Sequence, residues 1–207
     1  LETFGVDPSI TREEFFKYKF DVEYSRESIL SGVRNRYVKE MEGEEISDDL
    51  LPGFELIKNW NLRADSLNTS AALSILTLPN AFKPENLKYD RDSITIKLRE
   101  NMSYLKKQYG RIDVPLGRVV RLVRGETSLP LSGGPGTLRA IYSKKSGKNY
   151  KAVAGDCYIQ AVEWGPEGQL NAWSIHQYGS STMDKTSPHF DDQSKYFSKH
   201  ELKVIRQ

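Results

Sequence analysis

The residues best suited to chemistry lie near the end of the chain, in the sequence Ser-Pro-His-Phe-Asp-Asp-Gln at residues 187–193. His189, Asp191 and Asp192 offer an imidazole and two carboxylates within four residues, and such groups can bind a divalent metal ion. No further cluster of His or Cys supports them, and neighbouring Asp side chains point in different directions along a regular backbone. We therefore predict no metal site and no cofactor in this chain.

The same segment also has a structural interpretation, which we favour. Ser187 and Asp191 would cap a short turn by accepting hydrogen bonds from backbone amides. His189 or Gln193 would then tie that turn to the neighbouring sheet. Under this interpretation the segment fixes the end of the chain and takes no part in a reaction.

A serine-hydrolase triad is a second chemical possibility. Ser180 or Ser181 could be the nucleophile, His176 or His189 the base, and Asp156 the group that orients the base. Such combinations arise in any chain of this size. The strand, Gly-x-Ser-x-Gly turn and helix that present a nucleophilic serine do not accompany them. We predict no catalytic residue here.

Two other features favour structure over chemistry. The Gly-rich residues 132–136 could suggest a phosphate loop, but no Lys-Ser or Lys-Thr pair follows and no helix opens there, so a turn is predicted. Trp164 and Trp173 flank the turn of a predicted hairpin and could cover a ligand. Packing of aromatic rings across strands and against a neighbouring layer is their more ordinary role.

A β-rich half, residues 111–207, must position these segments. Apolar and polar residues alternate over residues 157–164 and 170–178, and residues 165–168 carry the Pro and Gly of a turn, so this stretch is predicted to be a hairpin. Further strands are predicted at residues 119–123, 137–142 and 202–205, and an exposed turn at residues 143–149.

The first half, residues 1–110, is predicted to be mainly helical. Thr11 and Glu14 form a capping box that opens a short helix. Ser25 is predicted to cap a longer helix with a buried stripe and a solvated basic face. The stripe is Ile29, Leu30, Val33, Tyr37 and Met41, and the basic face is Arg26, Arg34, Arg36 and Lys39. Three more helices are predicted. The first is capped at residues 47–49 and runs through Trp60, and the second covers residues 69–76 and starts at Ser66 or Asn68. The third runs from Asp92 or Ser93 to about Gln108, with Ile96 on its apolar side.

Composition limits the class of protein without naming it. The chain has 207 residues, enough for one or two domains, and its mixed charges sum to only +2. That balance does not predict a surface for nucleic acid or membrane. The apolar run at residues 71–78 is too short to span a bilayer. Cys157 has no partner for an internal disulfide.

Several ordered motifs together are more specific than any of these sites. Residues 155–156 are Gly-Asp, residues 177–180 are Gln-Tyr-Gly-Ser, and residues 187–193 follow. This ending resembles the penicillin amidase family, the N-terminal-nucleophile acylases. Residues 109–134 resemble a second stretch of that family, with Leu116 in place of the usual Trp. Residues 55–72 resemble a third, with Asn61 where Asp is common.

The resemblance implies a reaction and a fold. The family hydrolyses linear amides with a nucleophile, usually Ser, that self-cleavage exposes as the first residue of the β subunit and that uses its own α-amine as base. A backbone amide and an Asn form the oxyanion hole, and an Arg holds that Asn. The fold is a four-layer αββα sandwich. None of these catalytic groups falls on a matching position here, and Leu1 has no nucleophilic side chain.

We therefore expect an α+β fragment, the C-terminal part of an acylase β subunit, in which helices precede antiparallel strands and both parts belong to one larger domain. Alone it should be inactive, and it should either have an interrupted sheet or pair its sheet edges with a second copy of the chain. Its expected partners are the α subunit and the N-terminal part of the β subunit. The parent would cleave N-acyl substrates such as penicillin side chains or, by the motif spacing, N-acyl-homoserine lactones, and would be periplasmic or secreted.

An alternative from another class of protein stays open. The chain could be a non-catalytic β-rich module that binds a glycan or a peptide. Trp164, Trp173 and Tyr178 would then share one exposed face.

Overall fold

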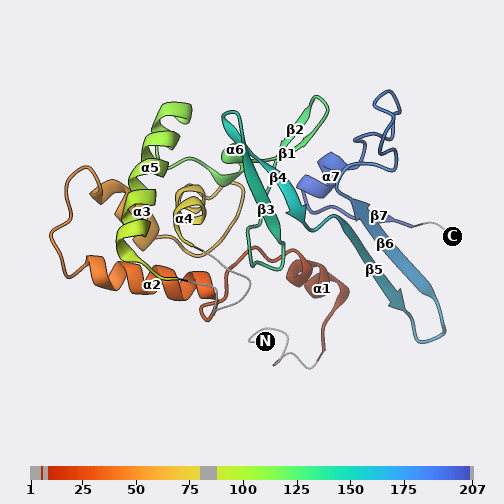
Figure 1. The fold of residues 1–207 in the computed structure, drawn as a ribbon. Coiled ribbons are helices and arrows are strands. Elements are labelled where there is room, and N and C mark those ends of the chain that lie inside the picture. The colour runs from red at the N-terminus through yellow and green to blue at the C-terminus, as the bar shows by residue number, and fades with distance from the viewer. Residues whose placement is uncertain (1–5, 7–8, 80–87, 206–207) are drawn as a thin grey trace.

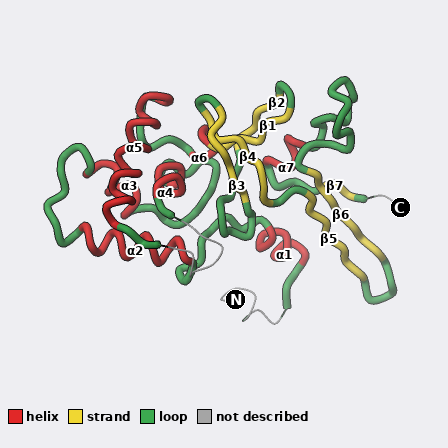
Figure 2. The backbone as a smooth tube through the Cα atoms, viewed as in Figure 1, coloured by secondary structure: helices red, strands yellow, loops and turns green. Residues whose placement is uncertain are grey.

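Helices fill one end of the molecule and strands the other. The computed structural model describes residue 6, residues 9–79 and residues 88–205. The N-terminal half is mostly helical and the C-terminal half mostly strands, as Figures 1 and 2 show. The predicted α+β class, with helices first, is confirmed. Within the described residues, no helix has both the length and the apolar character needed to cross a bilayer.

Seven helices are described. They are α1 (Arg12–Lys19), α2 (Ile29–Met41), α3 (Leu51–Lys58), α4 (Ala71–Thr77), α5 (Arg91–Tyr109), α6 (Leu116–Val119) and α7 (Ser194–Ser198). The capping box of Thr11 and Glu14 at α1 is confirmed. The predicted helix end near Gln108 agrees with α5, which ends at Tyr109 and is followed by Gly110, whose φ of 79° suits a glycine.

The start of α2 corrects a prediction. Its cap is Ser28, whose side chain accepts from the amide of Ser31, and not Ser25. Ser25 instead closes a preceding turn, because its hydroxyl accepts from the amide of Glu27 and its carbonyl from the amide of Ser28. A serine three residues upstream can thus delay a helix by offering the backbone a competing turn.

The starts of α3 and α5 differ from expectation, whereas the start of α4 agrees with one of its two predicted alternatives. Leu50 precedes α3 without a side-chain cap, so residues 47–49 do not cap it, and Trp60 lies beyond its end. At the start of α4, the side chain of Asn68 accepts hydrogen bonds from the amides of Ser70 and Ala71. Asp90 caps α5, so this helix begins at Arg91, before the predicted start at Asp92 or Ser93.

The basic face of α2 is only partly solvated. Arg34 donates to the carbonyl oxygens of Ile57, at 3.2 Å, and Lys58. These are the last carbonyls of α3, which lack partners within that helix. The Arg34 side chain therefore caps the C-terminus of α3. On α5, Ile96 is exposed, and the buried apolar residues are Ile94, Leu98 and Leu105.

The described strands form two separate, open sheets. The first contains β1 (Val120–Arg124), β2 (Thr127–Pro130), β3 (Ile141–Ser146) and β4 (Asn149–Gly155) in the order β2-β1-β4-β3. The second contains β5 (Tyr158–Trp164), β6 (Leu170–His176) and β7 (Lys203–Val204) in the order β5-β6-β7. This arrangement agrees with the expected interrupted sheet. The predicted hairpin corresponds to β5 and β6.

Two strand predictions and one turn prediction are corrected by the structure. The strands are not all antiparallel, because β1 pairs in parallel with β4. Residues 137–140 are not a strand, and residues 143–149 are not only a turn. The strand β3 runs to Ser146, Gly147 turns with φ of 60°, and β4 begins at Asn149. Lysines and serines mark residues 143–149 as polar, but polar residues can also form an exposed edge strand.

One hydrophobic core crosses the boundary between the helical and β-rich halves. Trp60 and Leu98 belong to the same buried cluster as Leu131 and Phe197. Hydrogen bonds also cross the boundary, since the amide of Gly133 donates to the carbonyl of Ala64 at 2.7 Å. The helices therefore cannot be separated from the first sheet without exposing core residues. The division at residue 110 marks a change of secondary structure within this shared core.

Candidate functional site

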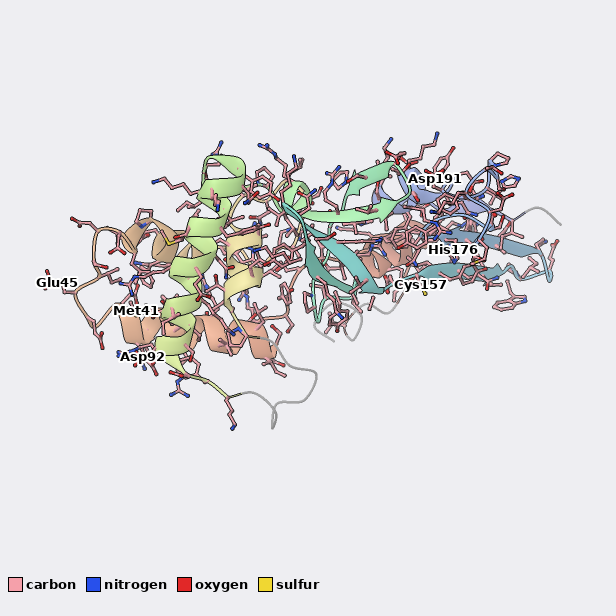
Figure 3. The ribbon with its side chains drawn as sticks, turned by 45° about the horizontal axis from the view of Figure 1, so that its top comes forward. Met41, Glu45, Asp92, Cys157, His176 and Asp191 are labelled. Atoms are coloured by element: carbon pink, nitrogen blue, oxygen red, sulfur yellow. The ribbon has the colours of Figure 1, made fainter. Side chains whose placement is uncertain are left out.

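The closing segment, residues 177–193, lies against the turn between β1 and β2. It leaves the end of β6, forms a loop, and returns to start α7. Figure 3 places Asp191, His176 and Cys157 toward the end of the molecule opposite Met41 and Asp92. The motif residues are therefore far from most of the helices.

Arg124, the last residue of β1, holds this segment. Its guanidinium donates to the carbonyls of Phe190, Ser181 and Thr182, at 3.3, 3.2 and 2.8 Å. The same group stacks on the rings of Phe190 and Tyr178, 3.9 and 4.8 Å from their centroids. One cation thus joins both ends of the segment to the first sheet.

Close backbone approach explains two of the motif glycines. A Cβ on Gly179 would overlap the carbonyl oxygen of His189. Gly155 has φ of 120°, and a Cβ there would overlap the carbonyl oxygen of Ala140. Any other residue would force these chains apart, so both glycines are needed for packing.

The structural interpretation of the segment is largely confirmed. Ser187 accepts from the amide of His189 at 3.2 Å. Gln193 ties the segment to β6, because its side chain accepts from the amide of His176 at 3.0 Å and its amide donates to the carbonyl of Tyr178. Asp191 differs from the prediction, because its side chain accepts from the hydroxyl of Thr127 instead of capping the turn.

The possible metal ligands do not converge. His189 Nδ1 lies 3.1 Å from Asp192 Oδ2 on the surface, whereas Asp191 turns toward Thr127. Across residues 9–79 and 88–205, no three His, Cys, Asp or Glu side chains are grouped in a way that could hold a metal ion.

The possible triad is not assembled either. His176 Nδ1 accepts from the amide of Tyr178, and Ser181 donates to the carbonyl of Asp184. Asp156 binds cations instead of a histidine. Its Oδ2 lies 3.1 Å from Lys19 Nζ and 3.4 Å from Arg139 Nη1.

A partly buried polar cluster surrounds Asp156. Arg139 is fully buried, donates to the carbonyl of Phe197 at 3.2 Å, and stacks on the Phe197 ring. Burial lowers the pKa of Arg139, and Asp156 opposes that effect. His200 lies in the same region, stacked on Phe20 with ring centroids 5.0 Å apart. Burial, followed by the charge of Arg139, lowers the pKa of His200 to about 4.

The Gly-rich residues 132–136 form a turn, as predicted. The amide of Gly134 donates to the Thr137 hydroxyl, and Gly133 has φ of 108°. Ser132 accepts from the amide of Ser66 at 2.9 Å. These amides and hydroxyls are used within the protein, so they do not form a phosphate-binding loop.

The aromatic residues of the binding-module alternative do not share a face. Trp164 is 72% exposed. Trp173 packs edge-on against Phe16 of α1 and under the guanidinium of Arg12. Tyr178 packs against the core below Arg124. The predicted packing against a neighbouring layer holds for Trp173 and is wrong for Trp164.

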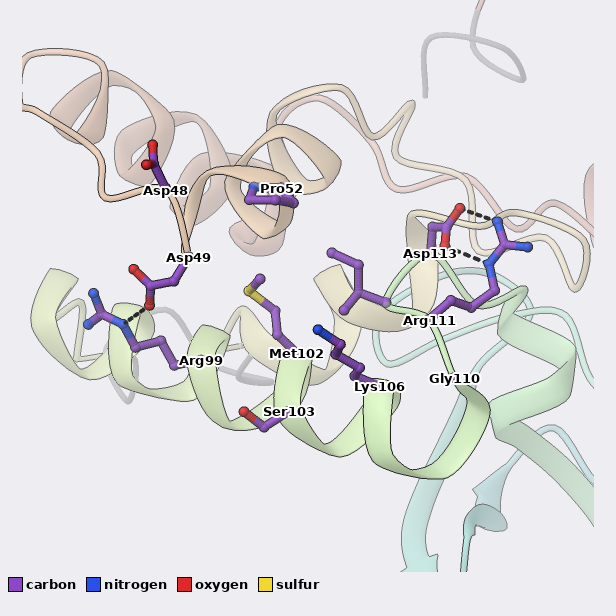
Figure 4. Close-up of a pocket in the computed structure, with 11 residues that line it drawn as sticks. Asp48, Asp49, Pro52, Arg99, Met102, Ser103, Lys106, Gly110, Arg111 and Asp113 are labelled. Carbon is purple, nitrogen blue, oxygen red and sulfur yellow. Dashed lines mark hydrogen bonds and ion pairs between the residues drawn. The ribbon is translucent and has the colours of Figure 1, made fainter.

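Sequence reasoning missed an open groove between the start of α3 and the second half of α5, shown in Figure 4. It has a volume of about 640 Å³. Arg99 pairs with Asp49, and Arg111 pairs with Asp113. Hydrogen bonds from Ser47 and then Arg99 lower the pKa of Asp49, and Arg111 lowers that of Asp113. These carboxylates are held ionised, so they are poor general acids.

Two departures from the family motifs have local explanations. Leu116 is fully buried in the core, where it still fills the interior with an apolar side chain. Asn61 accepts from the amide of Arg63 at 3.2 Å and from the side chain of Asn68 at 2.7 Å. A neutral side chain is sufficient for both bonds. Leu1 lies outside the described residues.

The geometry therefore explains the motifs by packing and hydrogen bonding within the closing segment. Comparison with protein families supplies the relationship that this geometry alone does not. The family model described as penicillin amidase matches residues 9–206, nearly the whole chain. The motif resemblance seen in the sequence is thus confirmed, and the chain belongs to the penicillin amidase family, a family of acylase-type hydrolases.

Proposed function

We propose that this chain is the C-terminal part of the β subunit of an acylase that hydrolyses linear amides. The observation that carries the proposal is the family match over residues 9–206. In this proposal the nucleophile is an N-terminal Ser exposed by autoproteolysis in polypeptide outside this chain. The chain by itself contributes structure and has no activity.

Features of the described residues support a structural role. The paired residues of β5 and β6 present Tyr158, Val162, Trp164 and Leu170 on one face of the hairpin, and all four are exposed. An apolar face of this kind is suited to packing against further polypeptide. We propose that the α subunit and the rest of the β subunit cover it within a four-layer αββα sandwich.

The substrate class follows the same proposal. The parent enzyme would release a carboxylic acid from an N-acyl amine, and the spacing of the closing motifs favours N-acyl-homoserine lactones over penicillin side chains. A periplasmic or secreted location is part of the proposal.

Intact mass and N-terminal sequencing of the natural protein would test it first. We expect a subunit that begins with Ser, Thr or Cys upstream of residue 1 and contains this chain. That complete protein should hydrolyse N-acyl-homoserine lactones, measured by mass spectrometry, and replacement of its first residue by Ala should abolish turnover. Turnover by the 207-residue chain alone, or a natural subunit that begins at Leu1, would contradict the proposal.

A further inference from the structure

The middle of the chain carries an excess of positive charge that its overall composition conceals. Residues 101–155 contain eleven Lys and Arg residues but only two acidic residues, Asp113 and Glu126. The whole chain nevertheless has a net charge of only +2. This stretch forms the second half of α5, the helix α6 and the four-stranded sheet.

Contacts between α5 and the β3–β4 hairpin bring many of these cations together. Tyr104 and Tyr109 of α5 both donate to the carbonyl oxygen of Lys148 in the hairpin turn, which lies near the end of α5 in Figure 1. Lys145 Nζ lies 4.4 Å from the Tyr104 ring centroid. The guanidinium of Arg118 lies 5.8 Å from the ring centroid of Tyr109. The two tyrosines thus form the centre of a basic surface.

The lysines of the hairpin lie on both faces of the sheet, with Lys145 toward Tyr104 and Lys144 and Lys151 on the opposite face, and none has a carboxylate partner among the described residues. Lys144 and Lys151 lie directly opposite each other on β3 and β4. Within the described part of the chain, the ion pairs of lysine involve only Lys19 and Lys58. Like charges in directly opposite positions destabilise a hairpin. An anionic occupant would remove this repulsion.

The edge of the sheet supplies a second recognition feature. β3 is the last strand in the order β2-β1-β4-β3. Its start is already engaged, because the amide of Ile141 donates to the carbonyl of Gly134, but no strand among the described residues pairs with the outer side of residues 143–146. Such an edge has backbone donors and acceptors that an extended segment can use. Lysines on the edge repel a second copy of the same strand, whereas they attract an acidic one.

We propose that β3 is a docking edge for an extended acidic polypeptide segment. The segment would pair its backbone with the outer side of β3 and place carboxylates beside Lys144, Lys145 and Lys151. The surface is less suited to a membrane, because the turn exposes Ser146 and Gly147 and no large apolar side chain. This proposal goes beyond the proposed function and does not depend on it.

Nucleic acid is also a weaker fit than an acidic polypeptide. Single strands are usually bound by aromatic rings on which bases stack. The ring of Tyr104 already packs edge-on against Tyr109 and Tyr150, with centroids 6.4 and 5.8 Å apart, and lies under Lys145. These rings are occupied within the protein, so charge and the strand edge remain as the means of recognition.

Fluorescence anisotropy with a labelled peptide of alternating Glu and Thr residues would test the docking edge on the complete chain. We expect saturable binding that weakens as salt is added. The double variant Lys144→Glu and Lys151→Glu should bind about tenfold more weakly, because two attractive charges become repulsive. The matched variant Lys39→Glu and Lys97→Glu, which reverses two exposed lysines on α2 and α5, should bind as the natural chain does. Equal loss in both variants would overturn the proposal.

A second comparison separates backbone pairing from charge alone. The same peptide with alternate backbone nitrogens methylated keeps its carboxylates but cannot form strand hydrogen bonds on that side. We expect it to bind about tenfold more weakly. Equal binding of the two peptides would overturn the docking edge, as would the absence of saturable binding. Tighter binding of a single-stranded oligonucleotide or of anionic lipid vesicles, abolished by the Lys144 and Lys151 changes, would overturn the choice of an acidic polypeptide.

Discussion

Arg124 shows how one side chain can organise a segment that the sequence marks only as a motif. Its charge-assisted bonds to three carbonyls and its stacking on two rings depend on a planar guanidinium. We expect Arg124→Lys to destabilise the protein by about 2 kcal/mol, because an ammonium cannot reproduce this set of bonds. Urea unfolding would measure the loss.

Amide hydrogen exchange would show which segments lose stability in Arg124→Lys. Amides in residues 177–193 should exchange faster in Arg124→Lys, whereas those of α2 should not change. The exposed Arg26 provides a matched control, and Arg26→Lys should have little effect on either quantity. Unchanged exchange in the closing segment of Arg124→Lys would show that Arg124 does not hold it.

His200 is a second residue whose role the sequence did not suggest. Its backbone has φ of 64°, its ring is stacked on Phe20, and its Nε2 is buried without a hydrogen-bond partner in the described chain. The charges that act on it come from Arg139, Asp65, Asp156 and Lys19. Protonation would place another positive charge beside Arg139 in a site that is poorly solvated.

This environment predicts a pH dependence of stability. His200 has a pKa of about 4 when folded and its ordinary value of 6.5 when unfolded. Between these values the unfolded chain binds more protons, so stability is complete above pH 6.5 and falls as the pH falls toward 4. The loss from this group should approach about 3 kcal/mol.

Comparison with His200→Asn isolates that contribution, because Asn tolerates positive φ and does not titrate. Free energies of unfolding measured from pH 7.5 to pH 4 should fall more steeply for the natural chain than for the variant. The neighbouring charged groups are present in both proteins, so their own titration largely cancels. Parallel curves would contradict the assigned cause.

At the scale of elements, glycines decide how closely strands and loops approach. Gly155 ends β4 with φ of 120° against the carbonyl of Ala140. We expect Gly155→Ala to destabilise the protein by about 3 kcal/mol, since both the backbone angle and the space are unsuitable for a side chain. The matched change Gly32→Ala lies in α2, where a Cβ would meet nothing within 4 Å, and should stabilise by about 0.5 kcal/mol. Thermal unfolding would give the two opposite shifts, and shifts of the same sign would contradict this explanation.

The elements also show which sequence patterns are reliable. The β5–β6 hairpin follows from strict alternation around a Pro-Gly turn, and Ile159 and Ala161 are buried as that alternation requires. The β3–β4 hairpin was missed because its residues 143–149 are polar and because β4 also pairs with β1, which lies far from it in the sequence. A strand that is exposed at an edge has no apolar period to reveal it.

At the scale of the whole molecule, the shared core predicts a single unfolding transition. Trp60 lies in the helical half and Trp173 in the second sheet, and the core between them includes residues of both halves. We would compare two variants, one that keeps Trp60 but not Trp173 and one that keeps Trp173 but not Trp60. In each variant, far-ultraviolet circular dichroism and tryptophan fluorescence should give the same urea midpoint. Two separated midpoints would show that residues 1–110 and 111–207 unfold independently.

The charge distribution also becomes meaningful only at this scale. A net charge of +2 gave no indication of a charged surface, because acids outside residues 101–155 offset the cations within it. Folding places Lys145, Lys148 and Arg118 around two tyrosines of α5, at distances that the sequence alone does not specify.

The sequence by itself determined the family, the order of helices before strands, the capping box of α1 and the β5–β6 hairpin, because these depend on local patterns and ordered motifs. Only the tertiary structure decided that Arg124 binds the closing segment, that Asp156 pairs with Arg139, and that β1 pairs in parallel with β4. Each of these contacts joins residues far apart in the chain. Their formation depends on how the whole core packs, and no short window of sequence contains that information.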